Sequence, residues 1–256
     1  MTNLSKKIIA FDLDGTLAES KRPVTEEISR LIEELAKQKI VVVISGGTFK
    51  QFSTQFLPAF SKEALSSSFV KNLILLPTSG SQRYEYDSEE KEWKLTDLEL
   101  FPEDIKEKAK KILKEIIDSD LYDIPKNPTG EYIEDRITQL SISALGQEAP
   151  IEQKKLWDPD QKKRQKIKEI LDKKLPETSI IIGGTTTIDI LPKGFDKAKG
   201  LARLLDKLGM NINDIIFVGD SIFPGGDDYS VYEAGIENIK VSGPTEAKEL
   251  IEKWIT

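Results

Sequence analysis

Two carboxylates, Asp12 and Asp14, stand two residues apart where a short apolar run meets a glycine. Residues 7–11 read Lys-Ile-Ile-Ala-Phe, which predicts a buried strand of a parallel sheet. Gly15 permits a sharp turn after the strand because it has no Cβ. Side chains two positions apart in an extended backbone face the same side. The pair is therefore expected at the carboxyl end of the strand, where ligands bind in open α/β sheets.

Paired carboxylates at such a point suit three kinds of chemistry. One can attack phosphorus as a nucleophile, and one can donate and accept a proton. Together they can hold a hard cation such as Mg2+, which prefers oxygen ligands. The alternative is a polar turn, since Asp-Gly is common turn chemistry. The apolar strand that delivers Asp-Leu-Asp-Gly-Thr favours the chemical interpretation.

A second apolar run, residues 40–44, ends in Ser45-Gly46-Gly47. A hydroxyl beside free backbone N–H groups makes a cradle for a phosphoryl oxygen. Ser45 is therefore a candidate catalytic group, and Gly46 and Gly47 are candidate binding residues. The alternative is a glycine-rich turn that Ser45 caps.

A third apolar run, residues 215–218, leads into Gly219-Asp220 and a glycine-rich loop that carries Asp227 and Asp228. Acidic groups this close repel one another unless a cation lies among them. The loop therefore predicts a cation site, and the alternative is a solvated acidic turn.

Lys197 lies at the start of a predicted helix. A cation there opposes the helix dipole, so we expect an anion such as a phosphoryl group to hold it. Lys193 is a competing candidate. A plain surface lysine is the further alternative, because the chain contains 37 Lys and Arg residues.

Composition excludes several function classes. The net charge of −7 argues against a general nucleic-acid binder, which needs a basic face. The chain has no cysteine and no histidine, which excludes disulfides, thiol catalysis, Ser-His-Asp triads and His-ligated metal sites. No apolar segment is long enough for a signal peptide or a bilayer span, so we expect a cytoplasmic enzyme without a membrane partner.

Strands and helices alternate at both ends of the 256-residue chain, which predicts a doubly wound, Rossmann-like α/β core. The middle differs, because runs at 83–86, 93–95, 132–136 and 139–143 alternate polar and apolar residues. That pattern is typical of antiparallel strands with one wet face. We therefore predict an α+β cap at residues 81–190, inserted between core segments 1–80 and 191–256.

The order of these motifs resembles that of the haloacid dehalogenase (HAD) superfamily, in its type IIB branch with a large cap after the second motif. Asp12-Leu13-Asp14 resembles the first motif, Ser45 the second, Lys197 the third and the 219–228 loop the fourth. The detailed match is to eukaryotic-type phosphomannomutases. The loop is similar to their Gly-Asp-x-x-x-Pro-Gly-Gly-Asn-Asp, with Asp227 in place of Asn. Residues 182–197 are similar to their Ile-Gly-Gly-x-x-Ser-Phe-Asp run and its Gly-Trp-Asp-Lys continuation.

The resemblance implies roles for these residues. Asp12 would be the nucleophile that forms an aspartyl-phosphate, and Asp14 would be the acid and base. Ser45 and Lys197 would stabilise charge on the transferring group. The resemblance also implies Mg2+, held by Asp12, the backbone carbonyl of Asp14 and Asp220, with Asp228 in support.

The resemblance further implies that the cap closes over the site, recognises a small-molecule sugar phosphate and forms a homodimer. The substrate-binding positions in the cap would be Arg136, Gln147, Thr187 and Asp189. Arg136 can donate two hydrogen bonds to a phosphate. A surface salt bridge between Arg136 and a neighbouring acid, Glu134 or Asp135, is the alternative.

One departure from the family bears on the reaction. Residues 143–147 read Ser-Ala-Leu-Gly-Gln where the family has Ser-Pro-x-Gly-Arg, so Gln147 replaces a phosphate-binding arginine. A neutral amide holds a dianion more weakly than a guanidinium. This favours a sugar-phosphate phosphatase, with phosphomannomutase as the alternative. A third hypothesis is a non-catalytic sugar-phosphate-binding protein, although the chain carries all four motifs.

Overall fold

The computed structural model describes residues 5–65 and 67–255 and divides into two compact units. Unit 1 comprises Met1–Leu98 and Lys197–Thr256, and unit 2 comprises Glu99–Asp196. Among the described helices, none combines the length and apolar character that a membrane crossing requires.

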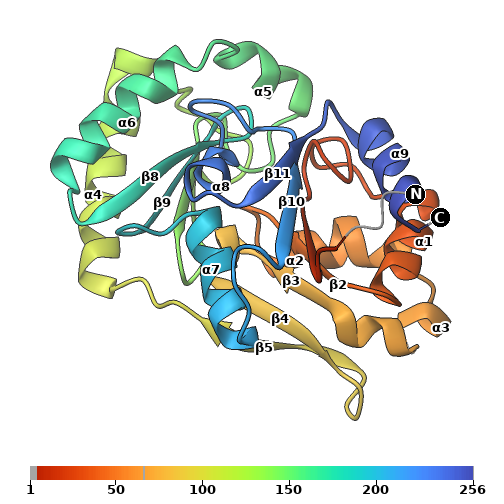
Figure 1. The fold of residues 1–256 in the computed structure, drawn as a ribbon. Helices are drawn as coiled ribbons and strands as arrows, with labels where there is room; N and C mark the ends of the chain where they lie inside the picture. The colour runs from red at the N-terminus through yellow and green to blue at the C-terminus, as the bar shows by residue number, and fades with distance from the viewer. Residues whose placement is uncertain (1–4, 66, 256) are drawn as a thin grey trace. The chain divides into compact units, whose positions relative to one another are not determined.

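Unit 1 is built on a seven-stranded sheet in the order β11-β10-β1-β2-β3-β4-β5 (Figure 1). The first five strands in this order pair in parallel. Their bounds are β1 Ile8–Asp12, β2 Ile40–Ile44, β3 Leu73–Leu76, β10 Ile215–Gly219 and β11 Glu237–Lys240. The predicted parallel α/β core is confirmed.

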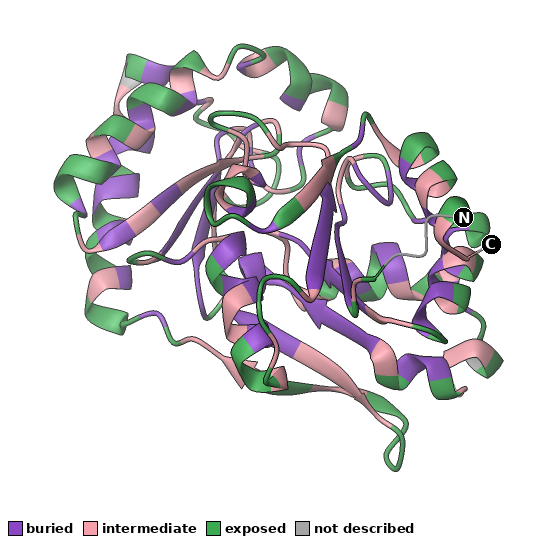
Figure 2. Cartoon of the chain, viewed as in Figure 1, coloured by how far each residue is buried: buried purple, intermediate pink, exposed green. Residues whose placement is uncertain are grey.

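Helices cover both faces of this sheet, which explains why the central strands are apolar on both sides (Figures 1 and 2). On one face, β1 and β2 pack against α1 (Glu26–Ala36) and α9 (Pro244–Ile255). On the other face they pack against α7 (Lys197–Leu208) and α8 (Tyr229–Glu233). Of these helices, the sequence patterns do not predict α8.

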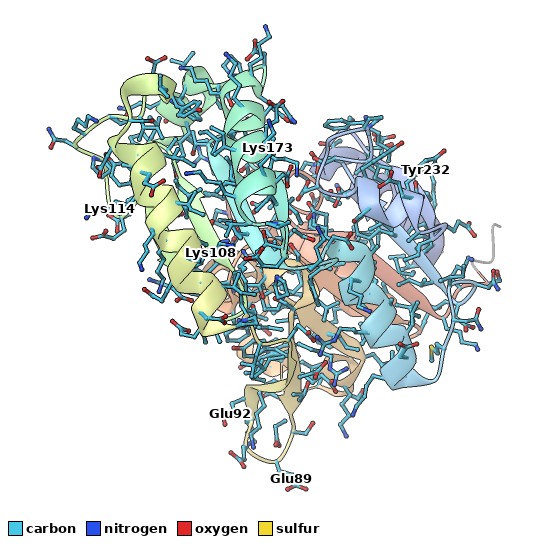
Figure 3. All side chains as sticks on the ribbon, turned by 90° about the vertical axis from the view of Figure 1, so that its left-hand side faces the viewer. Glu89, Glu92, Lys108, Lys114, Lys173 and Tyr232 are labelled. Atoms are coloured by element: carbon cyan, nitrogen blue, oxygen red, sulfur yellow. The ribbon has the colours of Figure 1, made fainter. Side chains whose placement is uncertain are left out.

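A hairpin extends this sheet beyond β3. Strands β4 (Gln82–Asp87) and β5 (Glu92–Leu98) form the predicted antiparallel pair, and Leu75 of β3 pairs with Tyr84 of β4. Glu89 and Glu92 mark its outer end in Figure 3. The hairpin thus belongs to the core sheet. The predicted cap, residues 81–190, includes the hairpin and therefore begins too early. The structure divides the chain after Leu98 and after Asp196, because alternation within a hairpin does not specify which sheet it joins.

Between β2 and β4 the chain forms a series of short helical segments. They are α2 (Phe49–Gln51), a π-helix (Phe52–Phe56), α3 (Lys62–Leu65) and three 3-10 turns at Leu57–Ala59, Ser68–Asn72 and Thr78–Gly80. The aromatic residues of this segment enter the core, and Phe52 and Phe56 are fully buried.

Unit 2 contains a four-stranded antiparallel sheet in the order β6-β7-β9-β8. Its elements are α4 Glu103–Asp118, a 3-10 turn Asp120–Tyr122, β6 Ile133–Asp135, β7 Leu140–Ser143, α5 Ile151–Trp157, α6 Lys162–Lys174, β8 Thr178–Gly183 and β9 Thr187–Pro192. Alternate isoleucines and leucines of the strands pack with α4 and α6. Lys108, Lys114 and Lys173 project from these helices in Figure 3. The other sheet face carries polar side chains.

A buried ion pair stabilises one end of unit 2. The Arg164 Nε atom lies 2.9 Å from Asp158 Oδ2, and Arg164 Nη1 donates to the carbonyl oxygens of Gly183 and Gly184 at 3.2 and 2.7 Å. Both charged side chains are almost completely buried. This pair holds the start of α6 against the turn between β8 and β9.

Replacing Asp158 by alanine is expected to destabilise the protein by about 3–5 kcal/mol, because it leaves the Arg164 charge buried without a partner. Urea unfolding followed by circular dichroism measures the change. Asp160→Ala is the matched control, since Asp160 pairs with Lys162 at the exposed surface and should have little effect. Equal effects of the two substitutions would contradict this account.

Candidate active site

The carboxyl ends of the parallel strands bring the predicted groups of unit 1 together. Asp12 is the last residue of β1, while Ser45 and Asp220 directly follow β2 and β10. Because β10, β1 and β2 are parallel neighbours, their ends lie at one edge of the sheet. Asp12 and Ser45 are buried, and Asp220 is half-buried.

Lys197 lies within reach of three carboxylates. Its Nζ atom is 2.7 Å from Asp12 Oδ1, 2.6 Å from Asp228 Oδ1 and 2.9 Å from Asp227 Oδ2. The lysine side chain is 1% exposed, so these interactions take place away from bulk water. The competing candidate Lys193 is exposed and belongs to unit 2. The structure therefore joins Lys197, at the first residue of α7, to the acidic loop.

Two glycines make room for the acids. Gly15 has φ +89°, and a Cβ there would lie 2.6 Å from Asp220 Oδ2. A Cβ on Gly219 would lie 2.4 Å from Asp228 Oδ2. Side chains at these positions would therefore push the carboxylates out of place. The sequence interpretation of Gly15 as a turn residue is incomplete, because it also allows Asp220 to approach.

The acidic cluster fits a hard cation. Carboxylate oxygens of Asp12, Asp220 and Asp228 all lie within 4.8 Å of one another. Oxygen ligands of this kind suit Mg2+. Asp227 is a fourth carboxylate nearby. If all four are ionised, the single ammonium of Lys197 leaves three negative charges without balance. The carboxylate of Asp14 is not part of this group, and the role of its backbone carbonyl as a ligand stays a prediction.

Burial and mutual repulsion change the acidity of the cluster. Burial raises the pKa of Asp12 well above its ordinary value, and the charges of Asp228 and Asp227 raise it further against the opposing effect of Lys197. Burial also raises the pKa of Asp228, to about 6. For Lys197, burial alone would lower the pKa, but the charges of the surrounding aspartates outweigh it and keep the pKa well above the ordinary value.

The metal-free protein is expected to lose stability as the pH rises from the ordinary carboxyl value of 3.8 toward about 6, the pKa of Asp228. A carboxyl with a raised pKa holds its proton more tightly in the folded state, so this contribution is present at low pH and disappears as the proton leaves. Mg2+ requires ionised ligands, so its stabilising effect should grow over the same range.

Thermal unfolding with chelator and with saturating Mg2+, at about pH 5 and about pH 8, measures this difference. A monovalent salt at equal ionic strength is the control for general screening. A stabilisation by Mg2+ that is the same at both pH values would contradict the prediction.

Asp14 has its own set of donors. Its carboxylate accepts hydrogen bonds from the backbone N of Lys21 at 2.7 Å, from Gln51 Nε2 at 2.5 Å and from Gln55 Nε2 at 2.9 Å. The sequence patterns considered above do not single out either glutamine. Gln51 and Gln55 follow the Gly-Gly-Thr turn and are four residues apart, and that spacing is the signal that could find them, since residues four apart on a helix lie on one side.

Ser45 and the two glycines form a tight turn after β2. The Oγ atom of Ser45 accepts a hydrogen bond from the backbone N of Gly47 at 3.0 Å. The hydroxyl hydrogen of Ser45 can then be donated elsewhere. A Cβ on Gly47 would lie 1.5 Å from Gln51 Oε1, so a side chain there would displace the Gln51 amide.

Within unit 2, three of the predicted substrate residues lie together. Thr187 and Asp189 alternate on β9, on the face opposite the apolar core. Arg136 Nη1 lies 3.6 Å from Asp189 Oδ1, and Arg136 Nε lies 2.8 Å from Glu134 Oε2. The alternative ion pair with Glu134 is therefore present, in addition to the contact with Asp189.

The side-chain amide of Gln147 contacts the backbone of unit 2. Its Nε2 atom donates to the backbone carbonyls of Tyr132 and Ser141, at 3.3 Å in both cases. The amide hydrogens are thus directed at the backbone of unit 2.

Comparison with known proteins adds independent information. Residues 9–222 match the family described as haloacid dehalogenase-like hydrolase. The chain is 27% identical to a phosphomannomutase of Encephalitozoon cuniculi over 260 residues, which covers 99% of this chain and 95% of the relative. It is 29% identical to a phosphomannomutase of Spinacia oleracea over 231 residues, which covers 88% and 86% of the two chains.

Two solved structures show the same fold. An N-terminally truncated IMP-nucleotidase of Plasmodium falciparum superposes with a TM-score of 0.71 at 16% identity, covering 98% of this chain and 70% of that one. A haloacid dehalogenase-like hydrolase of Bacteroides thetaiotaomicron superposes with a TM-score of 0.62 at 17% identity, covering 97% and 99%.

Proposed function

The chain belongs to the haloacid dehalogenase-like hydrolase family, and on this premise we propose that it is a Mg2+-dependent phosphomutase that interconverts mannose 1-phosphate and mannose 6-phosphate. The observation that carries the proposal is the buried ammonium of Lys197 between the carboxylates of Asp12 and Asp228. The shared name of the curated relatives favours a mutase. This reverses the preference for hydrolysis that Gln147 suggests in the sequence.

In the proposed reaction Asp12 attacks one phosphorus of a hexose bisphosphate, the bond from that phosphorus to the sugar oxygen breaks and an aspartyl-phosphate forms. Asp14 protonates the departing sugar oxygen and later takes the proton of the monophosphate's hydroxyl that attacks the aspartyl-phosphate, which forms the bisphosphate again and frees Asp12. Lys197 and the Ser45 hydroxyl stabilise negative charge on the transferring group.

Asp12, Asp220, Asp228 and the carbonyl of Asp14 would hold Mg2+, which neutralises charge on the phosphoryl group when bound. The charge of the acidic cluster supports this assignment, because Lys197 alone does not balance it. In unit 2, Arg136, Thr187 and Asp189 would bind the sugar and its second phosphate through a guanidinium, a hydroxyl and a carboxylate.

A sugar-phosphate phosphatase is the second candidate, and the orientation of Gln147 favours it. A mutase must retain a bisphosphate intermediate while it turns around. The Gln147 amide hydrogens already bond backbone carbonyls, so this position offers less to a dianion than an arginine does.

Phosphorus NMR of mannose 1-phosphate with purified protein and Mg2+, with and without a hexose bisphosphate activator, separates the two candidates. We expect mannose 6-phosphate with little inorganic phosphate. Inorganic phosphate as the main product would establish the phosphatase instead. No reaction with or without the activator would contradict both functions for this sugar.

A further inference from the structure

The two glutamines that contact Asp14 form a closed network with it. Gln51 Nε2 donates one hydrogen to Asp14 Oδ2 at 2.5 Å and the other to Gln55 Oε1 at 2.7 Å. Gln55 Nε2 donates to Asp14 Oδ1 at 2.9 Å. This pattern determines both amide orientations, because a reversed Gln55 amide would place its oxygen against a carboxylate oxygen.

The local fold holds both amides in place. The chain passes from α2 into the π-helix at this point, and π-helical turns occur frequently at functional sites. Phe52 and Phe56, each the next residue after a glutamine, are fully buried in the core of unit 1. The backbone carbonyl of Gln55 also accepts a hydrogen bond from Val24 N at 2.8 Å, which joins the π-helix to the loop after Asp14.

Gln55 is 4% exposed, and an amide at that depth is unfavourable unless it is hydrogen-bonded. A leucine would fit the pattern of this apolar segment better. The hydrogen bond from Gln55 to the Asp14 carboxylate gives a physical reason for an amide at this position.

We infer that Gln51 and Gln55 are positioning residues that orient the carboxylate of Asp14 for proton transfer, an inference that rests on the proposed phosphoryl transfer. The geometry also selects the oxygen. Oδ1 accepts two hydrogen bonds, from Gln55 and from the backbone N of Lys21, whereas Oδ2 accepts one, from Gln51. A carboxylate oxygen has two lone pairs, so one on Oδ2 is left to carry the proton.

The choice of leaving group separates this role from a structural one. A sugar oxygen needs a proton as it departs, and a positioned acid contributes about 10²–10⁴-fold to such a step. A p-nitrophenolate ion departs without that help. If the Asp14 carboxylate is no longer held in its orientation, turnover of a sugar phosphate should therefore slow. The first release of p-nitrophenolate from p-nitrophenyl phosphate should not slow.

The experiment compares wild type, Gln51→Ala, Gln55→Ala and the control Thr54→Ala, all with Mg2+. Thr54 is exposed on the same segment, and its hydroxyl donates to the backbone carbonyls of Lys50 and Gln51. Stopped-flow absorbance gives the burst of p-nitrophenolate, and phosphorus NMR gives sugar-phosphate turnover. Thermal unfolding checks the fold of each variant, and half-buried Gln51 provides a second test if Gln55→Ala does not fold.

For Gln51→Ala we expect sugar-phosphate turnover to fall by about 10–100-fold, within the range for a positioned acid, while the burst rate stays near that of wild type. Thr54→Ala should match wild type in both assays. Equal losses in burst and turnover, or no loss in turnover, would overturn the positioning role while leaving the proposed function intact. A wild-type protein with neither burst nor turnover would overturn the proposed function and this inference with it.

Discussion

Replacing Asp12 by asparagine is expected to lower turnover of a sugar phosphate by a factor on the order of 10⁴ or more. The amide lacks the nucleophilic oxygen that would form the aspartyl-phosphate. The phosphorus NMR assay described above measures the loss, and acid-quenched protein incubated with radiolabelled substrate shows whether a covalent phosphoryl group is formed.

The fold of this variant should be retained. Asp228 and Asp227 still lie 2.6 and 2.9 Å from Lys197 Nζ, so the buried ammonium keeps two partners. Removing one charge also relieves repulsion within the cluster, because the charge of Asp12 is among those that oppose Asp227 and Asp228. Asp206→Asn, an exposed aspartate on α7, is the matched control and should remain fully active.

Substantial turnover by Asp12→Asn would show that another group is the nucleophile. The next result would support the hypothesis of a non-catalytic sugar-phosphate-binding protein. If wild type shows no turnover and both proteins bind mannose 1-phosphate equally in calorimetry, the protein is a binder and Asp12 has no chemical role.

Periodicity in the sequence predicts the local elements well, because burial on both faces demands continuous apolar runs. The run at Ile40–Ile44 becomes β2 with the predicted bounds. The hairpin shows the limit of this reasoning. Alternation identifies β4 and β5 as partners, but the pairing of Leu75 with Tyr84 is tertiary information that neither segment carries by itself.

The candidate site follows the same division. Asp12, Ser45 and Asp220 are predictable because each ends an apolar strand of one parallel sheet. The sequence shows that Asp227 replaces the Asn of the similar phosphomannomutase motif. Its contact with Lys197 could not be predicted, because that contact depends on the course of a loop. The contacts of Gln51 and Gln55 with Asp14 depend on the π-helix, and the apolar spacing of this segment does not distinguish a π-helix from an α-helix.

Replacing Lys197 by methionine is expected to destabilise the metal-free protein at neutral pH by about 3–5 kcal/mol, since it leaves buried carboxylates without their counter-charge. The charge of Lys197 lowers the pKa of Asp12 and Asp228 against the effect of burial, so both pKa values should rise further in the variant. Urea unfolding in chelator measures the change. Lys207→Met is the matched control, because Lys207 is exposed near the end of the same helix.

The pH dependence of that loss identifies its cause. Protonation removes the uncompensated charges, so the gap between Lys197→Met and wild type should narrow as the pH falls through the raised carboxyl pKa values. A loss from packing alone would be the same at every pH. The gap should also be smaller in an Asp12→Asn background, because one fewer carboxylate then depends on the lysine. Additive effects of the two substitutions would mean that Lys197 does not balance the charge of Asp12, despite the 2.7 Å between them.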